Sequence, residues 1–278
     1  IGSYGRSKIS NERRKDCFLK MNQTDLKEFL DTKVELYNTT RFIKSDPILI
    51  PHQLRDLGAG KEDIEIISFL VATIAWGNRK SIITNGNRLV KIMGNSPLDF
   101  ITNFTKKDSK YLSGFVHRTF NENDLNYFII ALQNIYLKYR GMESLFLENI
   151  KDNSLQYAIH KFKITFFSLP HLQRTEKHVS DPLKNSAAKR INMFLRWMVR
   201  NDQNGVDFGI WKSVPPSLLS CPLDVHTGNV SRKLGLITRK QNDAKAVVEL
   251  DKSLRKMDPI DPVKYDFALF GLGAFESF

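Results

Sequence analysis

Lys189 and Asp224 are the side chains of this sequence whose types and surroundings could do chemistry, and they are 35 residues apart. An amine can act as a nucleophile, and a fixed carboxylate can stabilise developing positive charge or take up a proton. Asp224 lies in the segment PLDVHTGNV, where it is a good N-cap for a helix from Val225 to Leu234 that stops at Gly235. The pattern predicts that the carboxylate is held in a fixed place. On the local sequence, helix capping alone would also explain Asp224.

The helix predicted over residues 187–200, with the sequence AAKRINMFLRWMVR, carries Lys189 near its start. Its apolar face is predicted to pack inward and consists of Ile191, Phe194, Leu195, Met198 and Val199. The opposite face is expected to be a solvent-facing stripe of three cations and an amide: Lys189, Asn192, Arg196 and Arg200. A stripe that is merely solvated is the alternative. The turn before the helix is made of short residues, Asn185, Ser186, Ala187 and Ala188. Such a turn would let a phosphate approach the free amides of the first helical turn.

Helical patterns dominate the rest of the chain, and alternating strand patterns bounded by Asn-Gly or Asp-Gly turns are nearly absent. The helical segments cover residues 65–76, 81–93, 123–139 and 155–167. The fold class is therefore predicted to be all-α. Two loop regions interrupt the helices, over residues 174–186 and 201–221, and the second is long enough to be an insertion or a hinge.

Composition narrows the classes of partner. The chain has 278 residues, 41% of them hydrophobic, which is enough for a substantial core. Lys and Arg outnumber Asp and Glu by 42 to 30, and the resulting net charge of +12 favours an anionic partner such as nucleic acid. No apolar stretch reaches the length of a membrane helix, and the N-terminus lacks the apolar core of a signal peptide. We therefore expect a soluble protein that has no membrane partner.

Cysteine and histidine usage argues against a metal or a cluster. Cys17 and Cys221 are the two cysteines, too few for a disulfide framework, a four-cysteine iron-sulfur cluster or a cysteine-rich zinc site. The histidines show no metal-ligand spacing. We expect no cofactor and a reducing, intracellular setting. Residues 1–20 are polar and basic and precede Met21, so they are expected to be a disordered tail.

The turn of short residues, the helix with a lysine near its start and the later P-x-D-x-H segment together resemble the helix-hairpin-helix DNA glycosylases. The resemblance covers about residues 60–278. The segment LKNSAAKRIN aligns without gaps with the family hairpin L-P-G-V-G-x-K-x-A-N and matches it at Leu183, Lys189 and Asn192. PLDVHTGNV is close to the PVDTHV or PVDVH form of the family and is the most specific match. Asn185 and Ala187 replace the two hairpin glycines, and because Ala adopts a left-handed backbone poorly, an altered grip on DNA is expected.

Two features of the sequence, the spacing between Lys189 and Asp224 and the cysteine content, distinguish among the branches of this family. The spacing between Lys189 and Asp224 is similar to that of the archaeal 8-oxoguanine glycosylase branch, and the extra length is the loop over residues 201–221. The cluster-binding cysteines of the endonuclease III branch are missing. As a whole, the chain looks most like an uncharacterised bacterial family related to these enzymes.

The resemblance implies roles for individual residues. Lys189 takes the place of the nucleophilic amine, and Asp224 takes the place of the catalytic aspartate. In its uncharged form the amine would attack the sugar carbon to give a Schiff base, after which β-elimination nicks the strand. A base cannot be excised from inside a stacked duplex, so a pocket for a flipped nucleotide is required. The residues expected to line that pocket are Trp76, Asn78, Asp266 and Phe270. The residues expected to contact DNA are Lys184, Asn185, Ser186, Arg190, Arg196, Arg200 and His226.

The resemblance also implies two helical lobes with a cleft between them. The N/C-terminal lobe is expected to comprise residues 21–59 and 216–278. The central lobe is expected to comprise residues 60–215 and to hold the hairpin-like segment over residues 172–200. Core packing is the structural alternative for Trp76 and Phe270, and a phosphate contact or a surface cation is the alternative for Lys189.

Three functions follow as hypotheses. The first is a DNA repair glycosylase that excises a damaged base, with an oxidised purine among the candidates, and that has Schiff-base AP lyase activity. It is expected to act as a monomer on duplex DNA in the cytoplasm, in association with the nucleoid. The second, favoured by the missing hairpin glycines, is a noncatalytic nucleic-acid-binding module. The third, a scaffold for another protein, predicts no salt-dependent affinity for nucleic acid.

Overall fold

The computed structural model describes residues 21–44 and 46–278, and its fold is all-α, which confirms the predicted class. The expected tail over residues 1–20, which includes Cys17, lies outside the described residues. In the described ranges the α-helices before the central loop region are α2 (Gln23–Tyr37), α3 (Thr40–Ile43), α4 (Leu49–Asp56), α5 (Lys61–Ile74), α6 (Arg79–Ile92), α7 (Pro97–Thr102), α8 (Glu122–Tyr139), α9 (Met142–Leu147) and α10 (Gln156–Phe166). The later α-helices are α11 (Lys189–Val199), α12 (Val225–Lys233), α13 (Ala244–Met257) and α14 (Tyr265–Phe275).

Short elements connect these helices. The 3₁₀ helices are η1 (Lys106–Leu112), η2 (Gln173–His178), η3 (Pro182–Lys184), η4 (Pro216–Leu218) and η5 (Pro262–Lys264). The strands β1 (Val116–His117) and β2 (Phe120–Asn121) form an antiparallel pair. No helix in the described part of the chain is long and apolar enough to cross a membrane.

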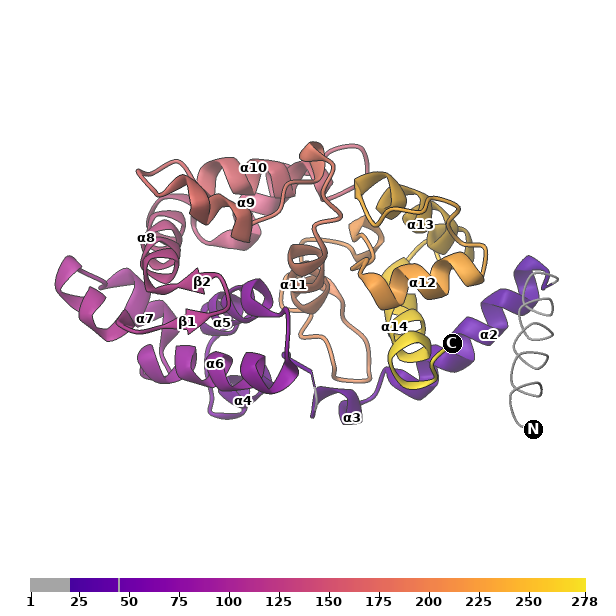
Figure 1. The fold of residues 1–278 in the computed structure, drawn as a ribbon, viewed down its shortest axis with the longest axis horizontal. Coiled ribbons are helices and arrows are strands. Elements are labelled where there is room, and N and C mark those ends of the chain that lie inside the picture. Colours follow the sequence, from indigo (N-terminus) through magenta and orange to yellow (C-terminus); the bar gives the residue numbers. More distant parts are fainter. Residues whose placement is uncertain (1–20, 45) are drawn as a thin grey trace, which may run out of the picture.

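Helix α5 belongs to the group of helices on the left of Figure 1 and packs against several of them. Its sequence is apolar around most of the helix, and every residue from Ile64 to Ile74 is buried. It packs against α4, α6, α7 and α11. Near its middle, the Phe69 ring meets four phenylalanine rings at centroid distances of 5.4 to 5.9 Å: Phe128, Phe162, Phe166 and Phe194. A helix that is apolar all round has to be covered on all sides, so α5 fixes the positions of its neighbours.

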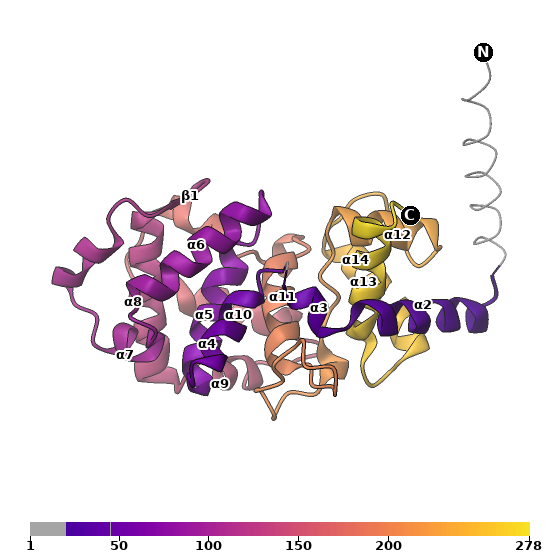
Figure 2. The ribbon, with the colours of Figure 1, turned by 90° about the horizontal axis from the view of Figure 1, so that it is seen from below.

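A second group, α2, α12, α13 and α14, lies on the other side of α11 (Figures 1 and 2). Helix α14 packs against both α2 and α12. Gly271 permits the close approach to α2, because a Cβ atom there would lie 2.2 Å from Cδ2 of Tyr37. Helix α4, by contrast, packs against α5 and α6, with Ile50 and Leu54 buried. The segment over residues 21–59 is therefore divided between the two groups, and the expected boundary at residue 59 is wrong for α4.

Helix α11 lies between the two groups (Figures 1 and 2), and this position overturns the predicted solvent-facing stripe. Asn192, Arg196 and Arg200 are only 1%, 4% and 2% exposed. The spacing along the helix was interpreted correctly, but the polar face is covered by the second group and by the loop that follows the helix. Of the expected stripe, only Lys189 keeps substantial exposure, at 30% of its side chain.

The loop over residues 201–221 helps to neutralise the two buried arginines. Arg196 pairs with Asp207 of this loop and with Asp266 of α14. Arg200 pairs with three carboxylates, those of Asp202, Asp207 and Asp261. Buried charges are tolerated only when they are paired in this way. The amides of residues 208 and 211 also donate to carbonyl groups of α11, so the predicted insertion or hinge is packed against the helix.

Candidate active site

Lys189 and Asp224 meet at the starts of two helices. Lys189 is the first residue of α11, and Asp224 is the N-cap of α12, as predicted. The Lys189 Nζ atom lies 3.9 Å from Asp224 Oδ2, and the two side chains are 30% and 24% exposed. Asp224 Oδ1 accepts a hydrogen bond from the Thr227 amide at 3.0 Å, and the Asn242 amide group donates to the Asp224 carbonyl at 2.8 Å. Capping therefore holds one carboxylate oxygen and leaves the other facing the amine.

The turn before Lys189 has an unusual backbone. Asn185 has φ of 64° and Ala188 has φ of 48°, both in the left-handed region. Asn tolerates this conformation, whereas for Ala it costs about 1 kcal/mol or more. Ala187, which aligns with the second family glycine, is not among the residues with positive φ. The turn is also preceded by the single-turn 3₁₀ helix η3 and not by an α-helix.

Asn192 stabilises this turn from inside the protein. Its amide group donates to the Ala187 carbonyl at 3.1 Å, and its side-chain oxygen accepts a hydrogen bond from Gln156 at 3.1 Å. The Ala188 amide donates to Ser186 Oγ at 3.1 Å. This buried amide therefore connects the turn to both α10 and α11.

An open cleft of about 520 Å³ borders Lys189 and Asp224. Its lining comes from the α3–α4 connection, the α5–α6 connection, α6, α11, α12 with its N-cap, and α14. The lining residues are Asp46, Pro47, Ala75, Trp76, Gly77, Arg79, Ile82, Lys189, Arg190, Met193, Asp224, Val225, His226 and Phe270. A recess of about 30 Å³ shares Lys189, Asp224, Asp46 and Phe270 with the cleft and adds Asp266. The structure therefore brings the two predicted catalytic residues into one cavity.

Of the expected base-pocket residues, Trp76 lines the cleft and Asn78 does not. One side of the Trp76 ring is covered by the Arg118 guanidinium, which lies 4.4 Å from the ring centroid. His117 is hydrogen-bonded through Nε2 to the Trp76 carbonyl at 3.0 Å. Asn78 is the N-cap of α6 and accepts from the Ser81 amide at 3.2 Å. Its role in this structure is capping, which local sequence could also have predicted.

Asp266 and Phe270 reach the same region from α14. Asp266 lies in the recess, is 6% exposed and pairs with Arg196. Burial raises the pKa of Asp266 to about 6, and the Asp224 charge acts in the same direction, whereas Arg196 opposes the shift. The Phe270 ring borders both cavities and lies 6.1 Å from the His226 ring. Phe270 therefore lies where a ligand of the cleft would contact it, and Asp266 lines the smaller recess.

The residues expected to bind DNA separate into exposed and buried ones. Lys184, Asn185 and His226 are exposed, and Ser186 is half-buried. Asn185 also donates to Asp243 at 3.3 Å, so the turn is tied to α13. Arg196 and Arg200, as shown above, are enclosed with carboxylates, so they cannot reach a phosphate in this structure. The expectation that these two arginines bind DNA is wrong.

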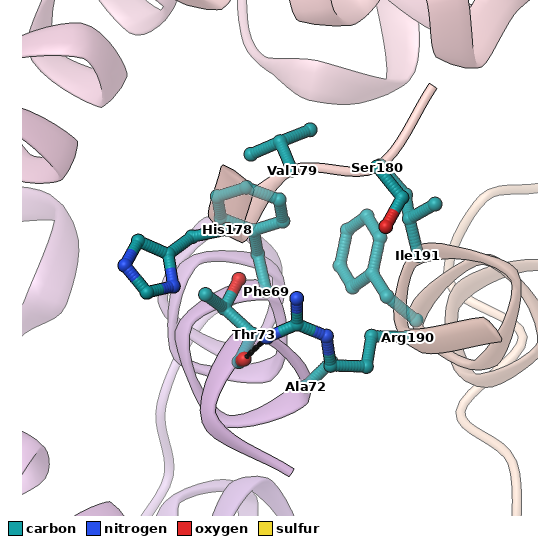
Figure 3. Close-up of a pocket in the computed structure, with 9 residues that line it drawn as sticks. Phe69, Ala72, Thr73, His178, Val179, Ser180, Arg190 and Ile191 are labelled. Carbon is teal, nitrogen blue, oxygen red and sulfur yellow. Dashed lines mark hydrogen bonds between the residues drawn. The ribbon is translucent and has the colours of Figure 1, made fainter. Parts of the chain in front are cut away.

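Arg190 turns its guanidinium group inward (Figure 3) and donates to the Thr73 carbonyl near the end of α5. Burial lowers the pKa of Arg190 to about 10. Its side chain borders a cavity of about 10 Å³ together with His178 and Phe69. The guanidinium therefore stabilises the end of α5, where carbonyl groups lack helical partners. The expected DNA contact is not supported by this orientation, although part of the side chain borders the cleft.

Asp46 and Met193 line the cleft and were missed by the sequence interpretation. Met193 is one helical turn after Lys189, and the Lys189 amine lies 3.5 Å from its sulfur. Arg79, the first residue of α6, is exposed at the cleft. Helical spacing from Lys189 could have identified Met193. Nothing in the sequence brings Asp46 to a lysine more than 100 residues later, because that proximity arises from long-range packing.

The chemistry available in the cleft is that of an amine beside a carboxylate. At 3.9 Å, Asp224 can take up a proton that Lys189 releases, and it can stabilise positive charge that develops next to it. Within residues 21–44 and 46–278, no three His, Cys, Asp or Glu side chains come together in an arrangement that could hold a metal ion.

Comparison with known proteins identifies a family for this chain. No curated protein and no solved structure gives a significant match. A family model described as "Protein of unknown function (DUF2400)" matches residues 46–275, a stretch that contains both Lys189 and Asp224. Since this stretch is more than half of the 278 residues, the chain belongs to the DUF2400 family.

Proposed function

We propose that this protein is a DNA glycosylase that removes a damaged base and then cleaves the strand through a Schiff base on Lys189. The observation that carries the proposal is the 3.9 Å separation between the Lys189 amine and the Asp224 carboxylate at one open cleft. The resemblance to the helix-hairpin-helix glycosylases assigns the nucleophile and the aspartate to these same two positions. Their separation of 35 positions in the sequence does not prevent the side chains from meeting.

The reaction would proceed in two stages. Asp224 accepts a proton from the Lys189 ammonium group, and the freed amine attacks C1′ of the sugar. A bond forms between the Lys189 nitrogen and C1′. The glycosidic bond between C1′ and the base breaks, and its electron pair leaves with the base, which takes up a proton. The C1′–O4′ bond then breaks, O4′ takes up a proton, and the nitrogen lone pair forms the C=N bond of the Schiff base. Loss of a proton from C2′ expels the 3′ phosphate by β-elimination. Once the departing base has taken up the proton that Asp224 holds, the Asp224 carboxylate is charged again and can stabilise the positive charge on the sugar.

Backbone strain next to Lys189 supports a functional role for the turn. Ala188 is held in the left-handed region, and residues in such conformations are concentrated at active sites. Hydrogen bonds with Asn192 and Ser186 hold the turn in this geometry. A fixed turn places the first residue of α11 in a constant position, which a nucleophile requires.

The cleft has the character expected for an extruded base. Trp76 and Phe270 provide aromatic surface, and Asp266 and Asp46 provide hydrogen-bonding groups. The net charge of +12 favours DNA as the partner. An oxidised purine is the substrate class that the resemblance favours. We place the enzyme in the cytoplasm, as a monomer associated with the nucleoid.

Borohydride trapping tests the proposal. Purified protein is incubated with borohydride and with duplexes that carry oxidised, deaminated or alkylated bases, and covalent adducts and free bases are measured. At least one duplex should give an adduct that is lost in Lys189→Gln and retained in Lys252→Gln, which changes an exposed lysine of α13. No adduct and no released base from any duplex would refute the proposal.

A noncatalytic nucleic-acid-binding module is the second candidate. Two observations favour it: Asn185 and Ala187 replace the hairpin glycines, and η3 is only one turn long. This candidate predicts salt-sensitive binding to DNA that Asp224→Asn leaves unchanged, with no product from any duplex. Base release that depends on Asp224 would exclude it.

A further inference from the structure

Asp46 is a buried carboxyl group at the edge of the cleft that the reaction described above does not use. It lies between α3 and α4 and borders both the cleft and the recess. Its side chain is 8% exposed. Oδ1 accepts a hydrogen bond from the Ile48 amide at 3.1 Å. In the part of the chain that the structure describes, no donor reaches Oδ2.

The other carboxylates of the recess have partners. Asp266 is paired with Arg196, and Asp224 lies beside Lys189. Asp46 instead has cations only at longer range, from Arg196, Lys189 and Arg79. Burial raises the pKa of Asp46, and these cations oppose the shift. Since the bond from the Ile48 amide uses only Oδ1, Oδ2 remains available to a donor that a ligand of the cleft supplies.

We propose that Asp46 is a specificity residue whose free oxygen, Oδ2, accepts a hydrogen bond from an N–H group on the edge of a base bound in the cleft. The inference rests on the proposed function, because it takes a base to be the ligand of this cleft. In its ionised form the Asp46 carboxyl group only accepts hydrogen bonds, so at a pH where Asp46 is ionised it would select bases that present N–H there and disfavour bases that present a ring nitrogen lone pair.

The competing explanation for Asp46 is purely structural. The bond from the Ile48 amide is a local turn at the start of α4, and it needs only one side-chain oxygen. Asp46→Asn keeps that acceptor and the shape of the side chain, but it can place an NH₂ group where Oδ2 was. Asp46→Ser also keeps an acceptor for the turn and removes the second oxygen. Both variants therefore preserve the structural role and remove the proposed one.

The test measures binding and not turnover. In the Lys189→Gln background, which lacks the proposed nucleophile, dissociation constants are measured for two duplexes that differ at one base. One carries hypoxanthine, which has an N1–H group, and the other carries unsubstituted purine, whose N1 is an acceptor. With Asp46 present, hypoxanthine should bind about tenfold more tightly, the value for one hydrogen bond to a charged group. Asp46→Asn and Asp46→Ser should reduce this preference to less than about twofold.

Asp56→Asn is the matched control, because it changes an exposed carboxylate on α4 and should leave the preference intact. Circular dichroism verifies that each variant is folded. Equal affinity for the two duplexes with Asp46 present, or a preference unchanged in both Asp46 variants, would overturn the inference. An Asp46-dependent preference without any borohydride adduct or released base would leave the inference standing and remove the proposed catalysis. A borohydride adduct together with a preference that does not depend on Asp46 would support the proposed catalysis and overturn the inference about Asp46.

Discussion

The Lys189 amine and the Asp224 carboxylate are 3.9 Å apart, although they start two different helices and are 35 residues apart in the chain. The loop that separates them in sequence folds back against α11 and supplies Asp207 to a buried arginine. The α12 N-cap can therefore lie beside the α11 N-terminus. The cap bond from Thr227 uses one Asp224 oxygen, so the same carboxylate can fix the helix start and face the amine.

Substitutions of Asp224 should separate capping from chemistry. Asn is as good an N-cap as Asp, so Asp224→Asn should keep the stability of the protein but lose the charge beside Lys189. We expect single-turnover base release to fall by about 10² to 10⁴-fold. Asp224→Ala should lose the same activity and also about 1 kcal/mol of unfolding free energy. Single-turnover kinetics and urea unfolding of both variants measure the two effects. Full activity of Asp224→Asn would contradict the assignment.

Asn192 should be important for stability because it connects the turn before Lys189 to α10. Asn192→Ala leaves the Ala187 carbonyl and the Gln156 amide group without this partner. Both groups are half-buried, so the unfolding free energy should fall by roughly 1 kcal/mol for each one left unpaired. Asn87→Ala, at an exposed position of α6, is the control and should change it by less than about 0.5 kcal/mol. Urea unfolding compares them, and equal stabilities would show that the turn does not need this amide.

Removing the charge of Arg200 should lower the stability of the protein, whereas removing the charge of Lys184 should not. Arg200 is buried among three carboxylates, so Arg200→Gln should cost about 3 to 5 kcal/mol of unfolding free energy. Lys184 is exposed at the turn, so Lys184→Gln should leave stability unchanged. If the turn contacts a phosphate, Lys184→Gln should reduce the slope of log affinity against log salt by about 1. Urea unfolding and salt titrations of DNA binding measure these effects, and a stable Arg200→Gln protein would be inconsistent with the buried network.

His178 should make stability depend on pH. Burial lowers its pKa from the ordinary 6.5 to about 4; Arg190, Lys177 and Arg174 act in the same direction, and Asp124 opposes them. The unfolded chain therefore takes up a proton near pH 6.5 while the folded protein does not. The contribution of the neutral, buried His178 imidazole to the unfolding free energy is complete above pH 6.5. It falls as the pH drops toward 4, by at most about 1.4 kcal/mol per pH unit.

The pH effect is measured as the difference in unfolding free energy between pH 7 and pH 5. This difference should be smaller in His178→Gln than in the unmodified protein, because the buried imidazole is gone. His226→Gln removes an exposed imidazole and should keep the original difference. Identical pH dependence in all three proteins would argue against a titration of His178.

The features that the sequence predicted correctly are those that depend on neighbours a few residues away. The all-α class follows from helical periodicity, and the Asp224 cap follows from an Asp before a run that ends at Gly235. The inward face of α11, with Phe194 and Met198, follows from the same periodicity. The left-handed backbone at Asn185 is consistent with the residue type.

Contacts between distant segments decided the rest. The periodicity of α11 placed Arg196 and Arg200 on one face but could not show that carboxylates from residues 202 to 266 would cover that face. Nor could it show that Lys189 would keep access to a cleft or that Asp46 would border it. Side-chain spacing along a helix is set by the geometry of the backbone, so it can be derived from the sequence. Which faces are buried is set by packing between elements far apart in the chain, so it had to be taken from the tertiary structure.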